Sequence, residues 1–144
     1  MAKLSLILLF IGCALAGPRG RPWTGGRVPY KIEHVGPSGE INIKAALSEI
    51  ERKTCIKFVP KSSADVYFVS FKRSPVSYMC AAKSVGMSMQ NNRNVVELST
   101  TCLNNKNTIM FETSHILGLY HPASPFGTPL TDADYSDLKK LYHC

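Results

Sequence analysis

Several common features are missing from this 144-residue sequence. After residue 16 it has no apolar run near the ~20 residues that a membrane-spanning helix needs. It also has no Cys-x-x-Cys pair, no internal repeat, no Asn-x-Ser/Thr glycosylation acceptor and no known nucleic-acid-binding motif. Acidic residues are few, with 10 Asp and Glu against 17 Lys and Arg. We therefore expect one basic domain, with a formal charge of +7, that neither crosses a membrane as a helix nor binds nucleic acid.

The first 16 residues have the pattern of a secretory signal peptide. Lys3 gives a positive start, residues 4–12 form an uncharged apolar run, and small residues follow at 14–16. The alternative, an N-terminal anchor, is disfavoured because the apolar run is too short to span a bilayer. We expect a secreted, extracellular monomer comprising residues 17–144, and Arg19 and Arg21 are candidate sites for a further cut.

Four cysteines follow the signal peptide: Cys55, Cys80, Cys102 and Cys144. An even number of cysteines in a secreted chain predicts two disulfides, and their spacing alone allows three pairings.

Hydrophobic periodicity divides the chain into alternating elements. We expect strands at 27–32, 55–59, 66–71, 85–89 and 95–98, and helices at 40–54, at 107–120 and from residue 131 onward. The strand at 66–71 is apolar on both faces, which is typical of a central, buried strand. This pattern predicts an α+β fold with four or five short strands, two main helices and a short terminal helix.

The residues that carry chemistry lie in the segment 111–121. Zinc hydrolases of the His-Glu-x-x-His type place two histidines one helical turn apart, with the intervening Glu as general base. In the longer form, a glycine turns the chain so that a third histidine reaches the metal. Four of the five defining positions of the longer form are present here, as Glu112, His115, Gly118 and His121. The first position is Phe111, which has no metal-binding atom.

This segment and several others resemble the astacin family of zinc endopeptidases, which are metzincins. Residues 23–30 resemble the family's W-x-G-G-x-x-P-Y start, and residues 50–58 its I-E-x-x-T-C-I-x-F run. Residues 130–144 resemble its closing L-S-x-x-D-x-x-x-L-x-x-L-Y-x-C. The resemblance covers most of residues 17–144 in order and implies a truncated astacin-like peptidase domain with a twisted, mostly parallel sheet and a shortened C-terminal part.

The resemblance also implies roles for particular residues. Glu112 would be the general base and His115 and His121 two zinc ligands, acting on a peptide or protein substrate. The disulfides would be Cys55–Cys144 and Cys80–Cys102. The strand formed by Val95, Val96, Glu97 and Leu98 corresponds to the edge strand along which the family's substrates pair.

The departures from the family bear on the same site. Phe111 replaces the first zinc ligand, and Pro122 stands where the family has Glu after the third histidine. Only 22 residues separate His121 from Cys144, and no methionine follows Met110 to form the family's turn under the zinc. Between Ala16 and Trp23 there is no room for the inhibitory propeptide of the family.

Three functions are compatible with these observations. The leading hypothesis is a secreted pseudopeptidase that binds peptides or proteins without cutting them. The second is a residual zinc endopeptidase with Glu112 as base, in which a water or another residue, with His34 and His143 as candidates, would be the third ligand. The third is a cationic, disulfide-stabilised protein that binds polyanions or microbial surfaces through its charge.

Overall fold

The computed structural model describes residues 20–122 and 124–144. The predicted signal peptide at 1–16 and the candidate cut at Arg19 lie outside the described residues. The elements, in chain order, are η1 (Thr24–Gly26), β1 (Arg27–Glu33), α2 (Gly36–Lys53), β2 (Lys57–Pro60), β3 (Val69–Arg73), β4 (Cys80–Ala82), β5 (Val95–Leu98), α3 (Thr100–Leu103), α4 (Lys106–Ile116) and α5 (Asp132–Leu141). No helix in this part of the chain is long and apolar enough to cross a membrane.

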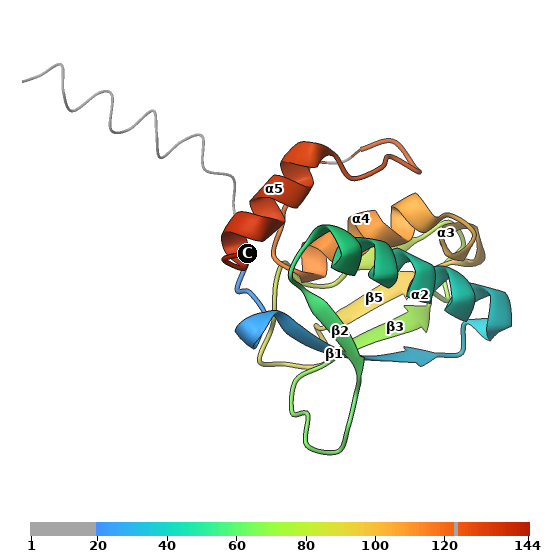
Figure 1. Cartoon of the computed structure of the whole chain (residues 1–144). Helices are drawn as coiled ribbons and strands as arrows, with labels where there is room; N and C mark the ends of the chain where they lie inside the picture. The colour runs from blue at the N-terminus through green and yellow to red at the C-terminus, as the bar shows by residue number, and fades with distance from the viewer. Residues whose placement is uncertain (1–19, 123) are drawn as a thin grey trace, which may run out of the picture.

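The strands form one five-stranded sheet in the order β2-β1-β3-β5-β4. All neighbours are parallel except β4, which runs antiparallel to β5. Helices α2 and α4 cover one face of the sheet, while α5 lies to one side near the start of the described chain (Figure 1). The predicted α+β fold with a mostly parallel sheet is confirmed.

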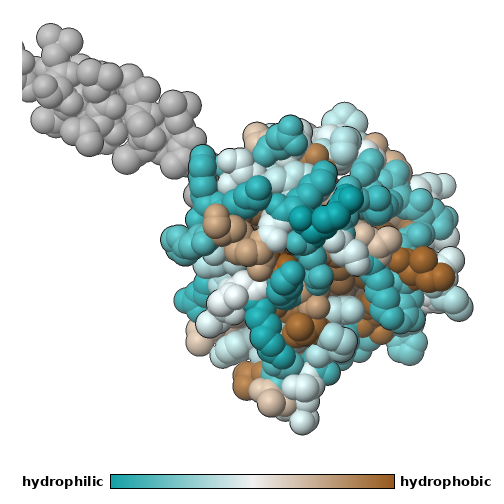
Figure 2. Space-filling view, in the orientation of Figure 1, coloured by the Kyte–Doolittle hydropathy of each residue, from teal (hydrophilic) through white to brown (hydrophobic). Residues whose placement is uncertain are grey.

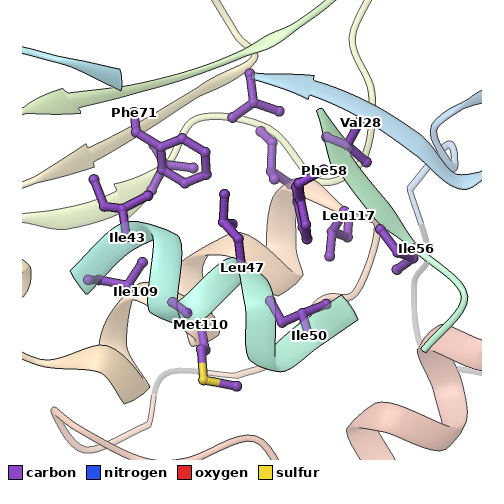
Figure 3. Packing of buried hydrophobic residues seen from close by; sticks show 14 of the residues in the cluster. Val28, Ile43, Leu47, Ile50, Ile56, Phe58, Phe71, Ile109, Met110 and Leu117 are labelled. Atoms are coloured by element: carbon purple, nitrogen blue, oxygen red, sulfur yellow. The ribbon is translucent and has the colours of Figure 1, made fainter. Parts of the chain in front are cut away.

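The hydrophobic core lies between the sheet and α2 and α4 (Figure 3). Ile43, Leu47 and Ile50 recur at helical spacing on α2 and are buried, as their periodicity predicted. They belong to the same core cluster as Phe71 of the central strand β3, which is also fully buried. Burying each of these side chains contributes about 1.5–3 kcal/mol. The opposite side of α2 is charged, and the surface over it is mostly hydrophilic with scattered apolar residues (Figure 2).

The prediction that Val95–Leu98 is the edge strand is wrong. This strand, β5, lies between β3 and β4, and the edge is the three-residue strand β4. Val95, Val96 and Leu98 are all buried, which is typical of an interior strand. The sequence Cys-Ala-Ala of β4 has neither alternation nor β-branched residues to mark it as a strand.

Two smaller expectations also differ from the structure. Residues 85–89 form no strand, and only Gly86 makes a single bridge, to Arg21. The short helix α3 was not expected; it begins after Ser99, whose side chain accepts a hydrogen bond from the backbone N–H of Cys102.

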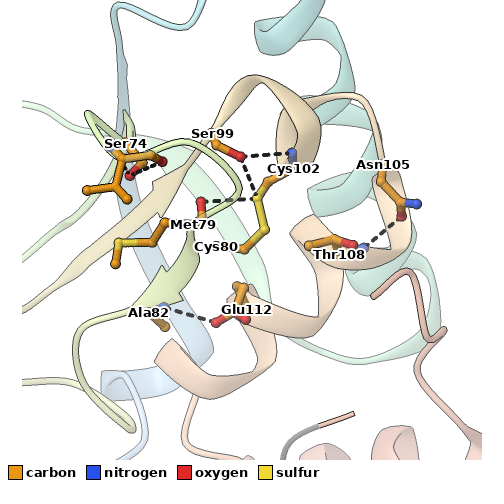
Figure 4. The surroundings of a disulfide bond; sticks show 10 residues. Ser74, Met79, Cys80, Ala82, Ser99, Cys102, Asn105, Thr108 and Glu112 are labelled. Atoms are coloured by element: carbon orange, nitrogen blue, oxygen red, sulfur yellow. Dashed lines mark hydrogen bonds between the residues drawn. A yellow bond between two sulfur atoms is a disulfide. The ribbon is translucent and has the colours of Figure 1, made fainter. Parts of the chain in front are cut away.

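Two disulfides join distant parts of the fold, with the pairing that the resemblance implied. Cys55 binds Cys144, which ties the start of β2 to the end of the chain, and Cys80 binds Cys102, which ties the edge strand to α3 (Figure 4). In the chain-entropy model each contributes about 3–5 kcal/mol. Such disulfides are typical of extracellular proteins.

Candidate functional site

Helix α4 carries most of the predicted site residues. Asn105 begins it, and its side chain accepts a hydrogen bond from the N–H of Thr108 at 3.0 Å. Beyond the helix, Gly118 has a φ of 117°, and a Cβ there would lie 2.7 Å from the side chain of Leu141. A glycine is therefore needed to turn the chain at this point, and the turn brings His121 back towards α4.

The end of α4 is held by two aromatic residues, Trp23 and Tyr142. The indole N–H of Trp23 donates to the carbonyl of Ile116 at 2.9 Å, and the hydroxyl of Tyr142 donates to the carbonyl of Leu117 at 2.7 Å. Burial raises the pKa of Tyr142, so this phenol stays a donor at physiological pH. These bonds satisfy helix carbonyls that would otherwise be buried without partners.

Phe111, His115 and His121 form one cluster of rings. The Phe111 ring stacks on His121, with centroids 4.8 Å apart, and meets His115 edge-on at 4.8 Å. The two imidazole centroids are 5.2 Å apart. The phenyl ring thus contacts both imidazoles, at the helix position where the longer zinc motif has its first histidine. Each ring pair contributes about 0.5–1.5 kcal/mol beyond its buried area.

Each imidazole has one nitrogen near a carboxylate and one without a partner. His121 Nε2 lies 2.7 Å from Asp134 Oδ1, while His115 Nδ1 lies 3.5 Å from Glu112 Oε2. The opposite nitrogens, His121 Nδ1 and His115 Nε2, are buried without a hydrogen-bond partner among the described residues. A metal-ligating histidine usually has a carboxylate hydrogen-bonded to its other ring nitrogen. The carboxylates here therefore hold both imidazoles in position, each with one free nitrogen that could bind a metal.

The carboxylate of Glu112, the family's general base, is hydrogen-bonded to the edge strand β4. Its Oε2 accepts a hydrogen bond of 2.9 Å from the backbone N–H of Ala82 in β4 (Figure 4). The side chain is 13% exposed, so little water competes for this bond. The carboxylate that the motif would aim at a metal-bound water is therefore bound to the backbone of the sheet edge.

The described residues do not fit a catalytic zinc ion. Catalytic zinc takes three protein ligands and one open position. Only His115 and His121 offer donor atoms in this cluster, and the described part of the chain contains no group of three His, Cys, Asp or Glu that could hold a metal. His34, between β1 and α2, and His143, after α5, do not complete the set.

Asp134 is the site residue that the sequence reasoning missed. It lies in the first turn of α5, where the helix dipole favours an acidic residue. In the structure it also completes a capping box with Thr131 and reaches His121. Burial alone would raise the pKa of Asp134, but the hydrogen bonds from the Thr131 backbone and from His121 lower it. The Thr-x-x-Asp spacing signals the cap, whereas nothing local signals the contact with His121.

A cavity of about 200 Å³ opens beside this cluster, between β4 and the segment 124–128. Its lining comprises Tyr78, Cys80, Thr108, Phe111, Glu112, Ser124, Pro125, Phe126, Gly127 and Thr128. The rings of Tyr78 and Phe126 are exposed at its rim.

Comparison with known proteins identifies the family. The profile of the astacin peptidase family matches residues 17–126. The chain belongs to the astacin family. It is 33% identical to zinc metalloproteinase nas-14 of Caenorhabditis elegans over 103 residues, and 31% identical to nas-15 of the same species. Each match covers 71% of this chain but only 20% and 17% of the relative, so the chain spans about a fifth of their length.

A solved structure gives the same assignment. High choriolytic enzyme 1, a hatching enzyme zinc-protease from the medaka fish Oryzias latipes, superposes with a TM-score of 0.53 at 25% identity. The match covers 70% of this astacin-family chain and 48% of the hatching enzyme. The names of these relatives imply zinc as the cofactor. In this chain Phe111 stands at the first histidine position of the zinc motif.

Proposed function

We propose that this protein is a secreted, catalytically inactive astacin homologue, a pseudopeptidase that binds peptide segments without cutting them. The observation that carries the proposal is the ring of Phe111, which contacts both His115 and His121. Losing even a supporting partner of a zinc ligand typically costs about 10–100-fold in affinity or activity, so losing a ligand itself should cost more.

The position of Glu112 supports the same conclusion. A general base must lie within hydrogen-bond reach of the proton that it removes. Here the carboxylate accepts from the Ala82 N–H, and this bond would have to break before Glu112 could serve a reacting water.

The free edge of β4 supports peptide binding. Ser99 N–H donates to Met79 and Lys83 N–H to Val95, so the backbone groups of the alternate residues Cys80 and Ala82 point away from β5. The Ala82 N–H is capped by Glu112, whereas Cys80 lines the 200 Å³ cavity. An extended peptide can pair with such an edge through backbone hydrogen bonds, without any metal.

The experiment is to incubate the disulfide-intact protein with a peptide library, with and without added zinc, and to score cleavage and retention separately. We expect retained peptides and no cleavage. Zinc-dependent cleavage that disappears in Glu112→Gln would overturn the proposal.

A residual zinc endopeptidase is the second candidate, because two observations favour it. The buried nitrogens His115 Nε2 and His121 Nδ1 lack hydrogen-bond partners among the described residues, and both imidazoles have a carboxylate behind them. One tightly held zinc per chain after dialysis, together with cleavage that requires Glu112, would establish this function instead.

A further inference from the structure

The face of the sheet opposite α2 and α4 is rich in lysine. Because side chains alternate along a strand, the register that buries Val28, Phe58 and Phe71 sends their neighbours to the open face. The basic residues on this side are Arg27, Lys31, Lys57, Lys72 and Lys83, joined by Lys61 at its rim. Three acidic residues accompany these six: Glu33, Asp65 and Glu97. We refer to these residues together as the lysine face.

The lysine face carries more positive charge than helices α2 and α5. Helix α2 carries three acidic and three basic residues and is neutral. Helix α5 carries three acidic and two basic residues. The lysine face therefore has an excess of three positive charges while these two helices have none, and a concentrated field of one sign attracts ligands of the opposite sign.

Three lysines of this face converge on a shallow hollow of about 460 Å³. Lys31, Lys72 and Lys83 line it together with Ser70, Asn92 and the ring of Phe68. Lys31 and Lys83 lie in one row across β1, β3, β5 and the end of β4, three strand spacings or ~14 Å apart. A linear chain that crosses the strands can contact both.

Carboxylates and an aromatic ring hold these ammonium groups in place. Lys31 and Lys72 lie 2.8 and 3.6 Å from Glu33, and Lys83 lies 2.9 Å from Glu97. Lys31 and Lys61 also lie 5.2 and 4.8 Å from the centroid of the Phe68 ring. Exposed ion pairs of this kind contribute little to stability, so an incoming anion can replace the carboxylates as partner of these lysines at little cost.

We propose that the lysine face binds a sulfated polysaccharide, with Lys31, Lys72 and Lys83 contacting its sulfate groups. Among the described residues, no large exposed hydrophobic side chain lies on any of the five strands, so the strands of this face offer none for insertion into a lipid layer. Hydroxyl, amide and ammonium groups around an aromatic ring instead suit a sugar chain with repeated negative charges. This site lies on the open face of the sheet, next to the peptide edge at Lys83, and stands whether or not that proposal holds.

The test is the affinity of the full protein for a heparin oligosaccharide, measured by calorimetry over a series of salt concentrations. The variant Lys31→Gln/Lys72→Gln/Lys83→Gln is compared with Lys44→Gln/Lys139→Gln/Lys140→Gln, which removes the same charge from α2 and α5. We expect the first variant to bind about tenfold more weakly or worse, with a smaller salt dependence, and the second to change by less than about threefold.

Glu97→Gln gives a prediction of opposite sign. It removes a competing carboxylate and frees Lys83, so binding should tighten. Equal losses in the two triple variants, or no heparin binding by the parent protein, would overturn the proposal. Equal or tighter binding to vesicles that contain anionic phospholipid, weakened by the same lysine substitutions, would also overturn it and would identify a membrane surface as the partner.

Discussion

Replacing Phe111 by histidine should create a three-histidine zinc site at the cluster of His115 and His121. The substitution supplies the missing first position of the motif, while His115 and His121 already present unpartnered nitrogens backed by carboxylates. Without metal, the variant loses the two phenyl–imidazole contacts, which is worth about 1–3 kcal/mol. At free zinc about 100-fold above its Kd, binding returns about 2.7 kcal/mol, or roughly 10 °C in Tm for a domain of this size.

The assay is thermal unfolding of Phe111→His with added zinc and with a chelator, together with zinc stoichiometry by native mass spectrometry. Phe111→Asn is the matched control, because it removes the same ring and offers a polar group of comparable size without an imidazole. We expect a zinc-dependent rise in Tm and one zinc per chain in Phe111→His alone. If both variants respond alike, or if the parent protein binds zinc as tightly as Phe111→His, then Phe111 is not what prevents metal binding.

Three further substitutions test individual contacts. Asp134→Asn should make the free energy of unfolding less dependent on pH at acid pH. The lowered pKa of this carboxyl means that its ionised form stabilises the fold above pH 3.8, and this stabilisation is lost as the pH falls below 3.8 through the lower pKa of the folded state. An unchanged pH dependence would contradict this role. Glu112→Ala should speed hydrogen exchange at the Ala82 amide and lower the free energy of unfolding in urea by about 1–3 kcal/mol. Glu112→Gln keeps a hydrogen-bond acceptor and should lower it by less. Equal effects of the two substitutions would argue against the hydrogen bond from the Ala82 N–H to the Glu112 side chain. Gly118→Ala should cost more than ~1 kcal/mol, because its φ of 117° and a contact at 2.7 Å both disfavour a Cβ, and a neutral result in the same assay would mean that the turn relaxes freely.

The sequence predicted the elements that have strong local signals. The apolar spacing of Ile43, Leu47 and Ile50 marks α2, and the cap at Thr131 marks the start of α5. The edge strand was wrong because three small residues at β4 have no strand signal, and their pairing depends on the position of β5. Local pattern determines whether an element forms, but neighbours in a sheet are chosen by the packing of the whole core.

The candidate site also combines features that the local sequence predicts with features that depend on how distant elements pack. The spacing of Glu112, His115 and His121 on and after one helix is a local property, and the structure brings all three together with Phe111. The contact of Asp134 with His121 depends instead on where α5 docks, which the disulfide at Cys144 and the hydrogen bonds of Tyr142 help to set. Such a contact leaves no local signal in the sequence.

These contacts hold the segment after α4 in place through side chains of the protein itself. Stacking joins Phe111 to His121, and the bond to Asp134, about 1.5–3 kcal/mol for a charge-assisted pair, joins His121 to α5. Together they supply a few kcal/mol, well below the roughly 10–16 kcal/mol of a structural zinc. They suffice only because the Trp23 and Tyr142 bonds already fix the same helix end, and the Cys55–Cys144 disulfide anchors the chain two residues after Tyr142. His115 and His121 can therefore be retained as packing residues, and their presence alone is weak support for zinc binding.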